Sequence, residues 1–300
     1  MKKLLLLINP SAGRQAGKNA LYDLVDRCDG AGYLVEVHPT RSRSAAAKLL
    51  KERAGEFDVV LCCGGDGTLN ETVTGLMSCE KKPLLAYVPA GTTNDFAATL
   101  GIARDPAAAC ADALAGHPFA FDVGRFNDRY FTYVAAFGAF TEVSYQTPQT
   151  LKNALGHTAY ILEGIRRLPE IRPRRVRIEY DGGVLTGDYI FGAVSNSTSV
   201  AGVLRLKEEK VSLSDGKFEV MLIRNPHDIV QLNGIITNLL TQNYDDQYVS
   251  FFHTTRAVIE SPEGMTWTLD GEDGGLQTRV EIENCHQALR LLLNKKIQKE

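Results

Sequence analysis

The chain has 300 residues, of which 44% are hydrophobic and 23% are charged, and its formal net charge at pH 7 is −3. This balance is typical of a folded globular protein with one or two domains and excludes disorder of the whole chain. The weakly acidic charge gives no reason to expect a nucleic-acid partner, so attraction to an anionic surface would have to be local.

The N-terminal segment MKKLLLLINP imitates a signal peptide over a few residues only. Asn9 and Pro10 end the apolar run Leu4–Ile8 far short of a signal-peptide core, and no small-residue cleavage site follows. A buried first strand is the better interpretation. No later stretch approaches the ~20 apolar residues that a membrane helix needs. We therefore expect a cytoplasmic protein that reaches any membrane from outside the bilayer.

The six cysteines form no CxxC pair, and Cys62 and Cys63 adjoin in an apolar run. Reduced thiols in the core are a better interpretation than a zinc site or a disulfide framework.

Strand-like and helix-like patterns alternate in the N-terminal part of the chain. The expected strands are Leu4–Ile8, Leu34–His38, Asp58–Cys63 and Leu84–Pro89, and the expected helices are Ala16–Cys28, Ser44–Arg53, Leu69–Met77 and Asp105–Ala115. This alternation predicts βαβ units around a parallel sheet with right-handed crossovers. We expect an α/β domain over residues 1–122, to which the C-terminal residues 288–300 return.

Residues 123–287 have a different pattern, which predicts a second, mainly β domain. Its strand-like segments are Arg129–Ala136, Arg175–Tyr180, Val184–Val194, Lys217–Arg224, Tyr248–Ser261 and Met265–Leu269, and its helix-like segments are Gln149–Leu168 and His227–Thr241. Turns of the Asp-Gly type separate several of these strands. An antiparallel β-sandwich is the expected architecture.

The segment GGDGTLNE, Gly64–Glu71, follows an apolar strand and opens a helix. Ligands of open α/β sheets bind beyond the carboxyl ends of the strands, where this loop is expected. Its glycines let backbone N–H groups approach phosphate oxygens, and the helix N-terminus adds a favourable dipole. Asp66 would repel a phosphate unless Mg²⁺ lay between the two. The alternative is a glycine-rich connection in which Asp66 only favours a turn.

Two more polar loops follow predicted strands of the same sheet. NPSAG, Asn9–Gly13, comes directly after the first strand, and PAGTTNDF, Pro89–Phe96, comes after the fourth and supplies hydroxyls and the carboxylate of Asp95. We expect these groups to meet at one edge of the sheet. Asp122, in the segment FDVG, is either a further carboxylate at the domain junction or a turn-capping residue.

Together, NPSAG, GGDGTLNE and PAGTTNDF resemble the diacylglycerol kinase catalytic family, which also includes sphingosine and ceramide kinases. The similarity covers nearly the whole chain. Further segments that resemble the soluble diacylglycerol kinases of Gram-positive bacteria are Asn127–Pro148, Ala159–Ile171, Val176–Gly182 and Leu269–Gly275.

The resemblance implies a Rossmann-like N-terminal domain, similar to phosphofructokinases and NAD kinases, a C-terminal β-sandwich, and a lipid site in the cleft between them. It also implies Mg-ATP as the phosphoryl donor. Asp66, Asp95 and Asp122 match the positions of an aspartate–water–magnesium network. The residues that match nucleotide contacts of the family are Asn9, Pro10, Ser11, Ala12, Gly13, Thr40, Gly65, Asp66, Gly67, Thr68, Leu69, Asn70, Glu71 and Thr92.

Glu272, in the segment DGE, matches the general base of similar enzymes. An alcohol loses its proton as it attacks phosphorus, and a well-placed carboxylate contributes ~10²–10⁴ in rate. The rest of phosphoryl transfer is positioning and charge neutralisation by Mg²⁺. Without the resemblance, a hairpin turn with an exposed acid would be the better interpretation of this segment.

The resemblance implies a second, structural Mg²⁺ at the segment SLSDGKF. Its ligands would be the backbone carbonyls of Ser212 and Lys217 and the carboxylate of Asp215, with water completing the shell. Residues 201–210 depart from the usual pattern of the family, because they contain no proline and carry extra charge. A type I′ turn at Asp215-Gly216 is the alternative.

A group of arginines stands out in this acidic chain, namely Arg166, Arg167, Arg172, Arg174, Arg175 and Arg177. Polybasic segments gain ~1 kcal/mol per residue at an anionic leaflet, so the group could hold the protein on an anionic membrane. A solvated strand, in which Val176 and Ile178 alternate with charged residues, explains it equally well. The apolar positions of Leu151–Leu168 fit core packing better than contact with acyl chains.

We therefore expect an ATP-dependent lipid kinase that converts diacylglycerol to phosphatidate, peripheral at the inner face of the cell membrane. The alternatives are a kinase for another hydroxylated lipid (sphingoid base, ceramide, undecaprenol or phosphatidylglycerol), an NAD kinase-like or sugar kinase, and a non-catalytic nucleotide-binding regulator. The lipid-kinase-like residues 127–182 disfavour an NAD or sugar kinase, and the presence of all four acids disfavours the regulator. No nucleic-acid partner is expected, and a homodimer is left open.

Overall fold

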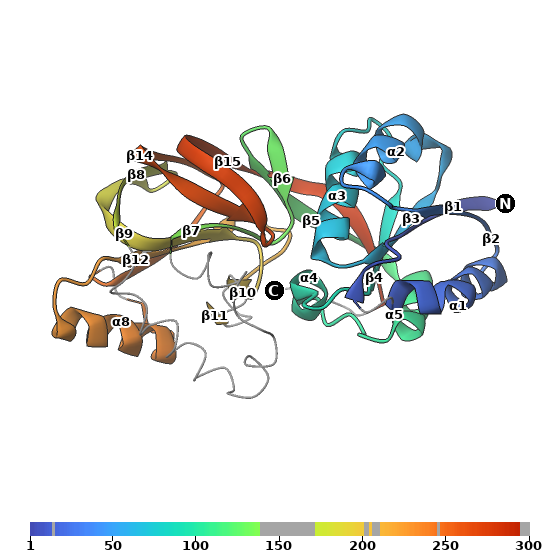
Figure 1. Ribbon diagram of the computed structural model, residues 1–300, viewed down its shortest axis with the longest axis horizontal. Helices are drawn as coiled ribbons and strands as arrows, with labels where there is room; N and C mark the ends of the chain where they lie inside the picture. The colour runs from blue at the N-terminus through green and yellow to red at the C-terminus, as the bar shows by residue number, and fades with distance from the viewer. Residues whose placement is uncertain (14–15, 139–171, 201–203, 206–210, 245–246, 295–300) are drawn as a thin grey trace. The chain divides into compact units, whose positions relative to one another are not determined.

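The computed structural model describes residues 1–13, 16–138, 172–200, 204–205, 211–244 and 247–294 (Figure 1). The chain divides into two compact units. Unit 1 comprises Met1–Val123 and His286–Glu300, and unit 2 comprises Gly124–Cys285.

Unit 1 is built on a parallel sheet. Its strands are β1 (Lys2–Ile8), β2 (Tyr33–Pro39), β3 (Val59–Gly64) and β4 (Leu84–Pro89), in the order β2–β1–β3–β4. The end of β15 (Glu272–Leu293) extends this sheet, because Leu291 pairs in parallel with Leu85 of β4. Leu4, Leu5, Leu6 and Leu7 are all 0% exposed, which explains the unbroken apolar run: a central parallel strand is buried on both faces.

Helices cover both faces of this sheet (Figure 1). They are α1 (Ala16–Gly30), α2 (Ala45–Arg53), α3 (Asp66–Met77), α4 (Asp95–Thr99) and α5 (Pro106–Leu114), with a 3₁₀ turn at Ala54–Glu56. On one face, Leu24 and Cys28 of α1 and Cys110 of α5 pack in one core with Leu6 and Leu61 of the strands. On the other face, α2 packs closely on α3.

The helices and strands predicted in this part of the chain are confirmed, with ends that shift by a few residues. The largest shift is in α3, which begins at Asp66 and not at Leu69. Asp105 caps α5, because its side chain accepts a hydrogen bond from the amide of Ala108 at 2.8 Å.

Unit 2 is an antiparallel β structure. Its strands are the end of β5 (His117–Phe126), β6 (Arg129–Phe131), β7 (Val134–Gly138), β8 (Arg174–Tyr180), β9 (Gly183–Ser195), β10 (Ser199–Val200), β11 (Leu204–Arg205), β12 (Phe218–Arg224), β13 (Val249–Thr254), β14 (Arg256–Leu269) and most of β15. The order is β13–β12–β9–β7–β14–β15, and β8 pairs with both β9 and β14. The long strands β9 and β14 thus each pair with β8 along one part and with β7 along another.

Trp267 is central to the core of unit 2. It is 0% exposed, and its ring lies edge-on to the rings of Phe126 and Phe137, with centroids 5.1 and 5.0 Å away. The predicted helix His227–Thr241 is confirmed as α8 (Ile229–Thr241), whereas the predicted helix Gln149–Leu168 lies outside the described residues.

Within the described residues, no helix combines the length and hydropathy needed to cross a membrane. All six cysteines are free, and Cys28, Cys62, Cys63 and Cys110 are buried. The prediction of reduced core thiols is confirmed for these four.

Candidate active site

The loops that follow β1, β3 and β4 meet at the carboxyl edge of the unit 1 sheet. The amide of Asn9 donates to the carbonyl of Cys63 at 2.9 Å, and the amide of Ala90 donates to the carbonyl of Gly64 at 2.8 Å. The predicted convergence of NPSAG, GGDGTLNE and PAGTTNDF is therefore present in the structure.

Glycine is required where these loops touch. A Cβ atom on Gly13, whose φ is +44°, would lie 2.0 Å from the carbonyl oxygen of Ala90, and one on Gly91 would lie 2.5 Å from the Cα of Gly65. Real Cβ atoms do not approach other atoms so closely, so the backbones pack against each other only because side chains are absent.

Asn9 connects the first loop to the beginning of α3. Its Nδ2 donates to Thr68 Oγ1 at 3.0 Å, and its Oδ1 accepts from the amide of Ser11 at 3.0 Å. The first amide of α3 to bond within the helix is that of Leu69, which donates to the carbonyl of Gly65 at 3.0 Å. The preceding amides, Asp66 to Thr68, form a helix N-terminus suited to an anion such as a phosphate.

Asp66 and Asp95, from different loops, lie next to each other. Oδ2 of Asp66 accepts a hydrogen bond from the amide of Asp95 at 3.2 Å. Both side chains are partly exposed, and each begins a helix, α3 and α4 respectively. Two carboxylates beside this helix end would repel a phosphate unless a cation joined them to it, and their oxygens are the ligands that Mg²⁺ prefers.

Asn94 fixes this arrangement, and its role was missed by the sequence analysis. Its φ is 54°, a left-handed conformation that asparagine tolerates. Its Oδ1 accepts from the amide of Gly91 at 3.0 Å, and its Nδ2 donates to the carbonyl of Gly91 at 2.9 Å. The hydroxyl of Tyr87 donates to the carbonyl of Gly64 at 3.3 Å, so Tyr87 ties β4 to the end of β3 below the loop.

The other residues predicted to contact a nucleotide differ in how far they are exposed to solvent. Thr40 is buried, and its amide and hydroxyl both donate to the carbonyl of Ile8, at 2.8 and 3.3 Å. Leu69 is 0% exposed and packs in the core, so only its backbone could contact a ligand. Thr92 is exposed, and Pro10, Ala12, Gly67, Asn70 and Glu71 are partly exposed.

Asp122 is 0% exposed and holds the returning strand β15. Its Oδ1 accepts from the amide of Gln287 at 2.7 Å and lies 3.1 Å from Nδ1 of His286. These contacts give Asp122 a structural part in unit 1 alongside its predicted place in the magnesium network.

In unit 2, Glu272 begins β15 directly after a tight turn. Asp270 and Gly271 have φ of +49° and +79°, the signature of a type I′ turn, and Leu269 pairs with Glu272 across the hairpin. The Glu272 side chain is exposed. The predicted hairpin turn is therefore present, and an exposed acid at its end is compatible with a general base.

Asp270 organises the turn, a second role that the sequence analysis missed. Although it is only 3% exposed, its carboxylate accepts from the amide and hydroxyl of Thr132, both at 2.7 Å, and from the amides of Tyr133 and Val134, at 2.9 and 3.1 Å. Four hydrogen bonds to one carboxylate fix the conformation of the residues just before Glu272.

At the predicted structural metal position, Oδ1 of Asp215 accepts from the amide of Lys217 at 2.9 Å. Gly216 has a φ of +79°, but Asp215 is not in the left-handed region, so the type I′ alternative is wrong: that turn requires a positive φ at both central residues. Among the described residues, no three His, Cys, Asp or Glu side chains are grouped closely enough to hold a metal ion. A cation here or near Asp66 would depend on backbone carbonyls, phosphate or water for its remaining ligands.

The arginines of β8 are paired with acids. Arg174 lies 3.4 Å from Glu263, and Arg175 lies 3.4 Å from Asp188. Arg177 likewise lies within 3.4 Å of Glu179 and Glu260. This pairing and the alternating burial of β8 favour the solvated-strand interpretation, and membrane docking by these arginines remains a prediction. Arg172 is exposed, and Arg166 and Arg167 lie outside the described residues, as does Leu151–Leu168.

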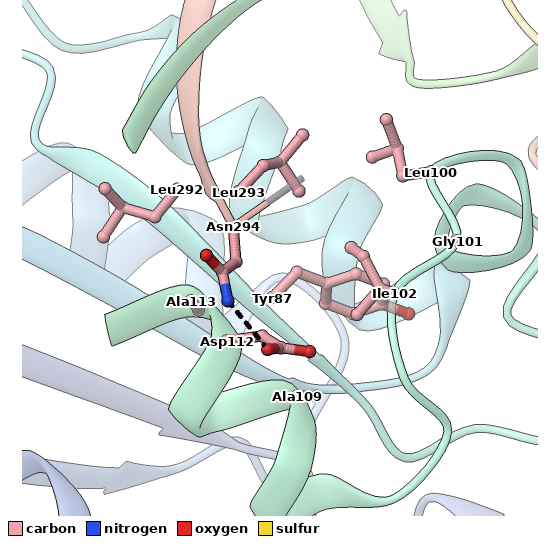
Figure 2. A pocket seen from close by; sticks show the side chains of 10 residues that line it. All are labelled: Tyr87, Leu100, Gly101, Ile102, Ala109, Asp112, Ala113, Leu292, Leu293 and Asn294. Atoms are coloured by element: carbon pink, nitrogen blue, oxygen red, sulfur yellow. Dashed lines mark hydrogen bonds between the residues drawn. The ribbon is translucent and has the colours of Figure 1, made fainter. Parts of the chain in front are cut away.

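A small pocket in unit 1 is lined by residues of β4, α5 and the end of β15 and by the segment after α4 (Figure 2). Its volume is ≈ 30 Å³, and its lining is mainly apolar, apart from groups such as Asp112 and Asn294, which are joined by a hydrogen bond of 3.1 Å. A volume of that size holds about one water molecule, so this pocket is not a nucleotide site.

The chain matches known proteins along nearly its whole length. Residues 3–126 match the family model of the diacylglycerol kinase catalytic domain. A diacylglycerol kinase of Bacillus subtilis (strain 168) is 35% identical over 98% of this chain and 97% of its own length. A diacylglycerol kinase of Staphylococcus aureus (strain Newman) is 33% identical over 91% of this chain and 87% of its own length.

Solved structures share the fold. The crystal structure of a diacylglycerol kinase from Bacillus anthracis str. Sterne has a TM-score of 0.77 at 22% identity, and covers 98% of this chain and 97% of that one. A second structure from the same organism has a TM-score of 0.80 at 25% identity, and covers 98% of this chain and 95% of that one.

These similarities, with the three loops that meet at the sheet edge, define the class as a lipid kinase with an α/β N-terminal part. The chain belongs to the diacylglycerol kinase family.

Proposed function

We propose that this protein transfers the γ-phosphoryl group of Mg-ATP to the free hydroxyl of diacylglycerol, giving phosphatidate. The observation that carries the proposal is the hydrogen bond between the amide of Asp95 and the carboxylate of Asp66, at 3.2 Å, beside the N-terminus of α3. Kinase chemistry needs an anion-binding helix end and acidic groups in the same place, and this edge of the sheet supplies both.

In this proposal the residues of unit 1 bind and orient the triphosphate. Amides at the beginning of α3 donate to phosphate oxygens, while Asn9 and Asn94 hold the flanking loops. Asp66 and Asp95, with Asp122, would hold the magnesium ion through oxygen atoms. Bound Mg²⁺ would neutralise charge on the triphosphate and fix its orientation for transfer.

Glu272 is the proposed general base. Its exposed carboxylate removes the proton from the acceptor hydroxyl as that oxygen attacks the γ-phosphorus, and the leaving group is ADP. Asp270 is a positioning residue, because its four hydrogen bonds fix the turn from which Glu272 extends.

The acceptor is inferred from the relatives. Both curated relatives described above carry the name diacylglycerol kinase, at 35% and 33% identity. Diacylglycerol lies in a bilayer, so we propose that the protein works at the inner face of the cell membrane. The second cation, at Ser212, Asp215 and Lys217, is proposed to be structural.

The proposal is tested by supplying γ-labelled ATP and Mg²⁺ with diacylglycerol, ceramide, sphingosine, undecaprenol or phosphatidylglycerol in mixed micelles, and with NAD in solution. We expect label in phosphatidate above all. Label mainly in another lipid would show that the acceptor is that lipid. Label in NAD would refute the proposal of a lipid kinase. Label in no product would indicate that the protein binds nucleotide or lipid without transferring phosphate.

A further inference from the structure

Glu219 is an acidic residue buried in strand β12 of unit 2. Its side chain is 1% exposed. The neighbouring residues Phe218 and Val220 belong to the main core of the unit, and alternate residues of a strand point to opposite faces, so Glu219 points to the other face. Its neighbours in register are Ser195 on β9 and His253 on β13.

The carboxylate of Glu219 has no matching partner within the described residues. Neither of its oxygens accepts a hydrogen bond, and the basic group that pairs with it in the described part of the chain is Nε2 of His253, at 3.9 Å, which is charged only when protonated. A buried carboxylate without a counter-charge or hydrogen bonds destabilises the folded state by roughly several kcal/mol.

Glu219 is the second residue after Lys217, and β12 begins at Phe218, directly after the turn that carries Ser212 and Asp215. The buried carboxylate is therefore close along the chain to the position where the resemblance to the family implies a cation.

We infer that Glu219 is a second acidic ligand, directly or through a bound water, of a divalent cation held at the Ser212–Lys217 turn. Asp215 would supply one carboxylate from the exposed side and Glu219 another from the buried side, with the carbonyls of Ser212 and Lys217 between them. Magnesium and calcium accept such all-oxygen sets and retain waters, so two side chains suffice. The inference rests on the cation proposed for this turn and not on the identity of the lipid.

The competing explanation is that Glu219 is a neutral acid and needs no ion. The two explanations differ in how the free protein responds to metal. If Glu219 serves a cation, Mg²⁺ stabilises the wild type against unfolding more than it stabilises Glu219→Gln, since the variant lacks one ligand of the site. If Glu219 is a neutral acid, Mg²⁺ stabilises both proteins equally.

The experiment measures Mn²⁺ binding by electron paramagnetic resonance without nucleotide or lipid. All variants carry Asp66→Asn, which weakens binding at the other expected site. We expect Glu219→Gln and Asp215→Asn each to lower the Mn²⁺ affinity about 10-fold or more, and Glu219→Asp to give an intermediate affinity. Glu263→Gln, with a side chain that is 77% exposed, is the matched control and should leave the affinity unchanged.

Thermal unfolding gives a second readout. In EDTA, Glu219→Gln should unfold at or above the temperature of the wild type, because a buried acid without a partner has been removed, and Mg²⁺ should raise the unfolding temperature of the wild type more than that of Glu219→Gln. Wild-type Mn²⁺ affinity in Glu219→Gln, or in Glu219→Asp if the Gln variant does not fold, overturns the inference, as does the absence of any bound Mn²⁺. Neither readout involves phosphoryl transfer, so failure of the kinase proposal would be seen separately.

Discussion

The amide of Asp95 donates a hydrogen bond of 3.2 Å to the carboxylate of Asp66, across 29 residues of sequence. The two residues begin neighbouring helices that start at the same edge of the sheet. Their contact links the GGDGTLNE and PAGTTNDF loops into one acidic group at the N-terminus of α3.

Replacing Asp66 by Asn should abolish most of the activity without unfolding the protein. The amide side chain keeps an oxygen that can accept from Asp95 but loses the charge that would hold Mg²⁺, so we expect kcat to fall by ~10²–10³. Steady-state kinetics with varied Mg²⁺ measure this, and circular dichroism checks the fold. Asp26→Asn, on the exposed side of α1, is the control, and equal losses in both variants would contradict the assignment.

Asn94 should affect turnover through the position of the loop. Asn94→Gly keeps the left-handed conformation but removes both hydrogen bonds to Gly91, and we expect kcat to fall by roughly 10- to 100-fold with a smaller change in KM. Asn94→Ala adds backbone strain of ~1 kcal/mol or more, which urea unfolding would detect. Asn94→Asp retains the oxygen that accepts from the Gly91 amide and should recover part of the turnover. A change in stability without a change in kcat would leave Asn94 a purely structural residue.

Glu272 and Asp270 should separate catalysis from stability. Glu272→Gln removes the proposed base on an exposed side chain, so we expect kcat to fall by ~10²–10⁴ while the free energy of unfolding stays within ~0.5 kcal/mol of wild type. Activity assays and urea titrations on the same preparation test both parts. Activity close to that of wild type in this variant would assign the base elsewhere.

Asp270→Ala should instead destabilise unit 2. It leaves the buried amides of Thr132, Tyr133 and Val134 without their acceptor, and each unsatisfied donor costs ~1–3 kcal/mol. We expect a loss of about 3 kcal/mol or more in the free energy of unfolding. Asp273→Ala, an exposed position in the same hairpin, should cost less than ~1 kcal/mol, and similar losses in the two variants would refute the role of Asp270.

Thiol labelling should report on both buried faces of the parallel sheet, because Cys62 and Cys63 are consecutive residues of β3. Cys62 and Cys63 are buried, so a reagent cannot reach them in the folded protein. Burial also raises the pKa of each thiol to about 12, so both remain protonated at neutral pH and react slowly. Cys79 and Cys285 are partly exposed. We expect iodoacetamide to modify Cys285 and Cys79 in the native protein, and Cys62 and Cys63 only after unfolding, as mass spectrometry of peptides would show. Early modification of Cys62 would contradict the buried position of β3.

The sheet of unit 1 could be predicted because its signals are local. Leu84–Pro89 was predicted as a strand, and β4 has these same ends, because a buried parallel strand reads as a continuous apolar run. The beginning of α3 was predicted three residues late, at Leu69 instead of Asp66. The sequence Asp-Gly-Thr has low helix propensity. Contacts of Asp66 and Thr68 with the neighbouring loops, and not the local sequence, fix the first turn of the helix.

Other features depend on residues far apart in the chain. Asp270 is 138 residues from Thr132, so no local pattern shows that its carboxylate would be buried. Strand β15 was missed for a similar reason. Its segment Glu281–Gln287 is rich in polar residues, and its β structure comes from partners such as β14 and from the Asp122 contact with Gln287.

The return of β15 to unit 1 also determines which fragments of the protein can fold as a complete unit 1. The stretch that matches the family model ends at residue 126, whereas unit 1 includes residues from His286 onward. A fragment that stops at residue 126 would leave the β4 edge uncovered and Asp122 without the amide of Gln287. Exposed strand edges promote aggregation. On the ribosome, unit 1 therefore cannot be completed until nearly the whole chain has been synthesised.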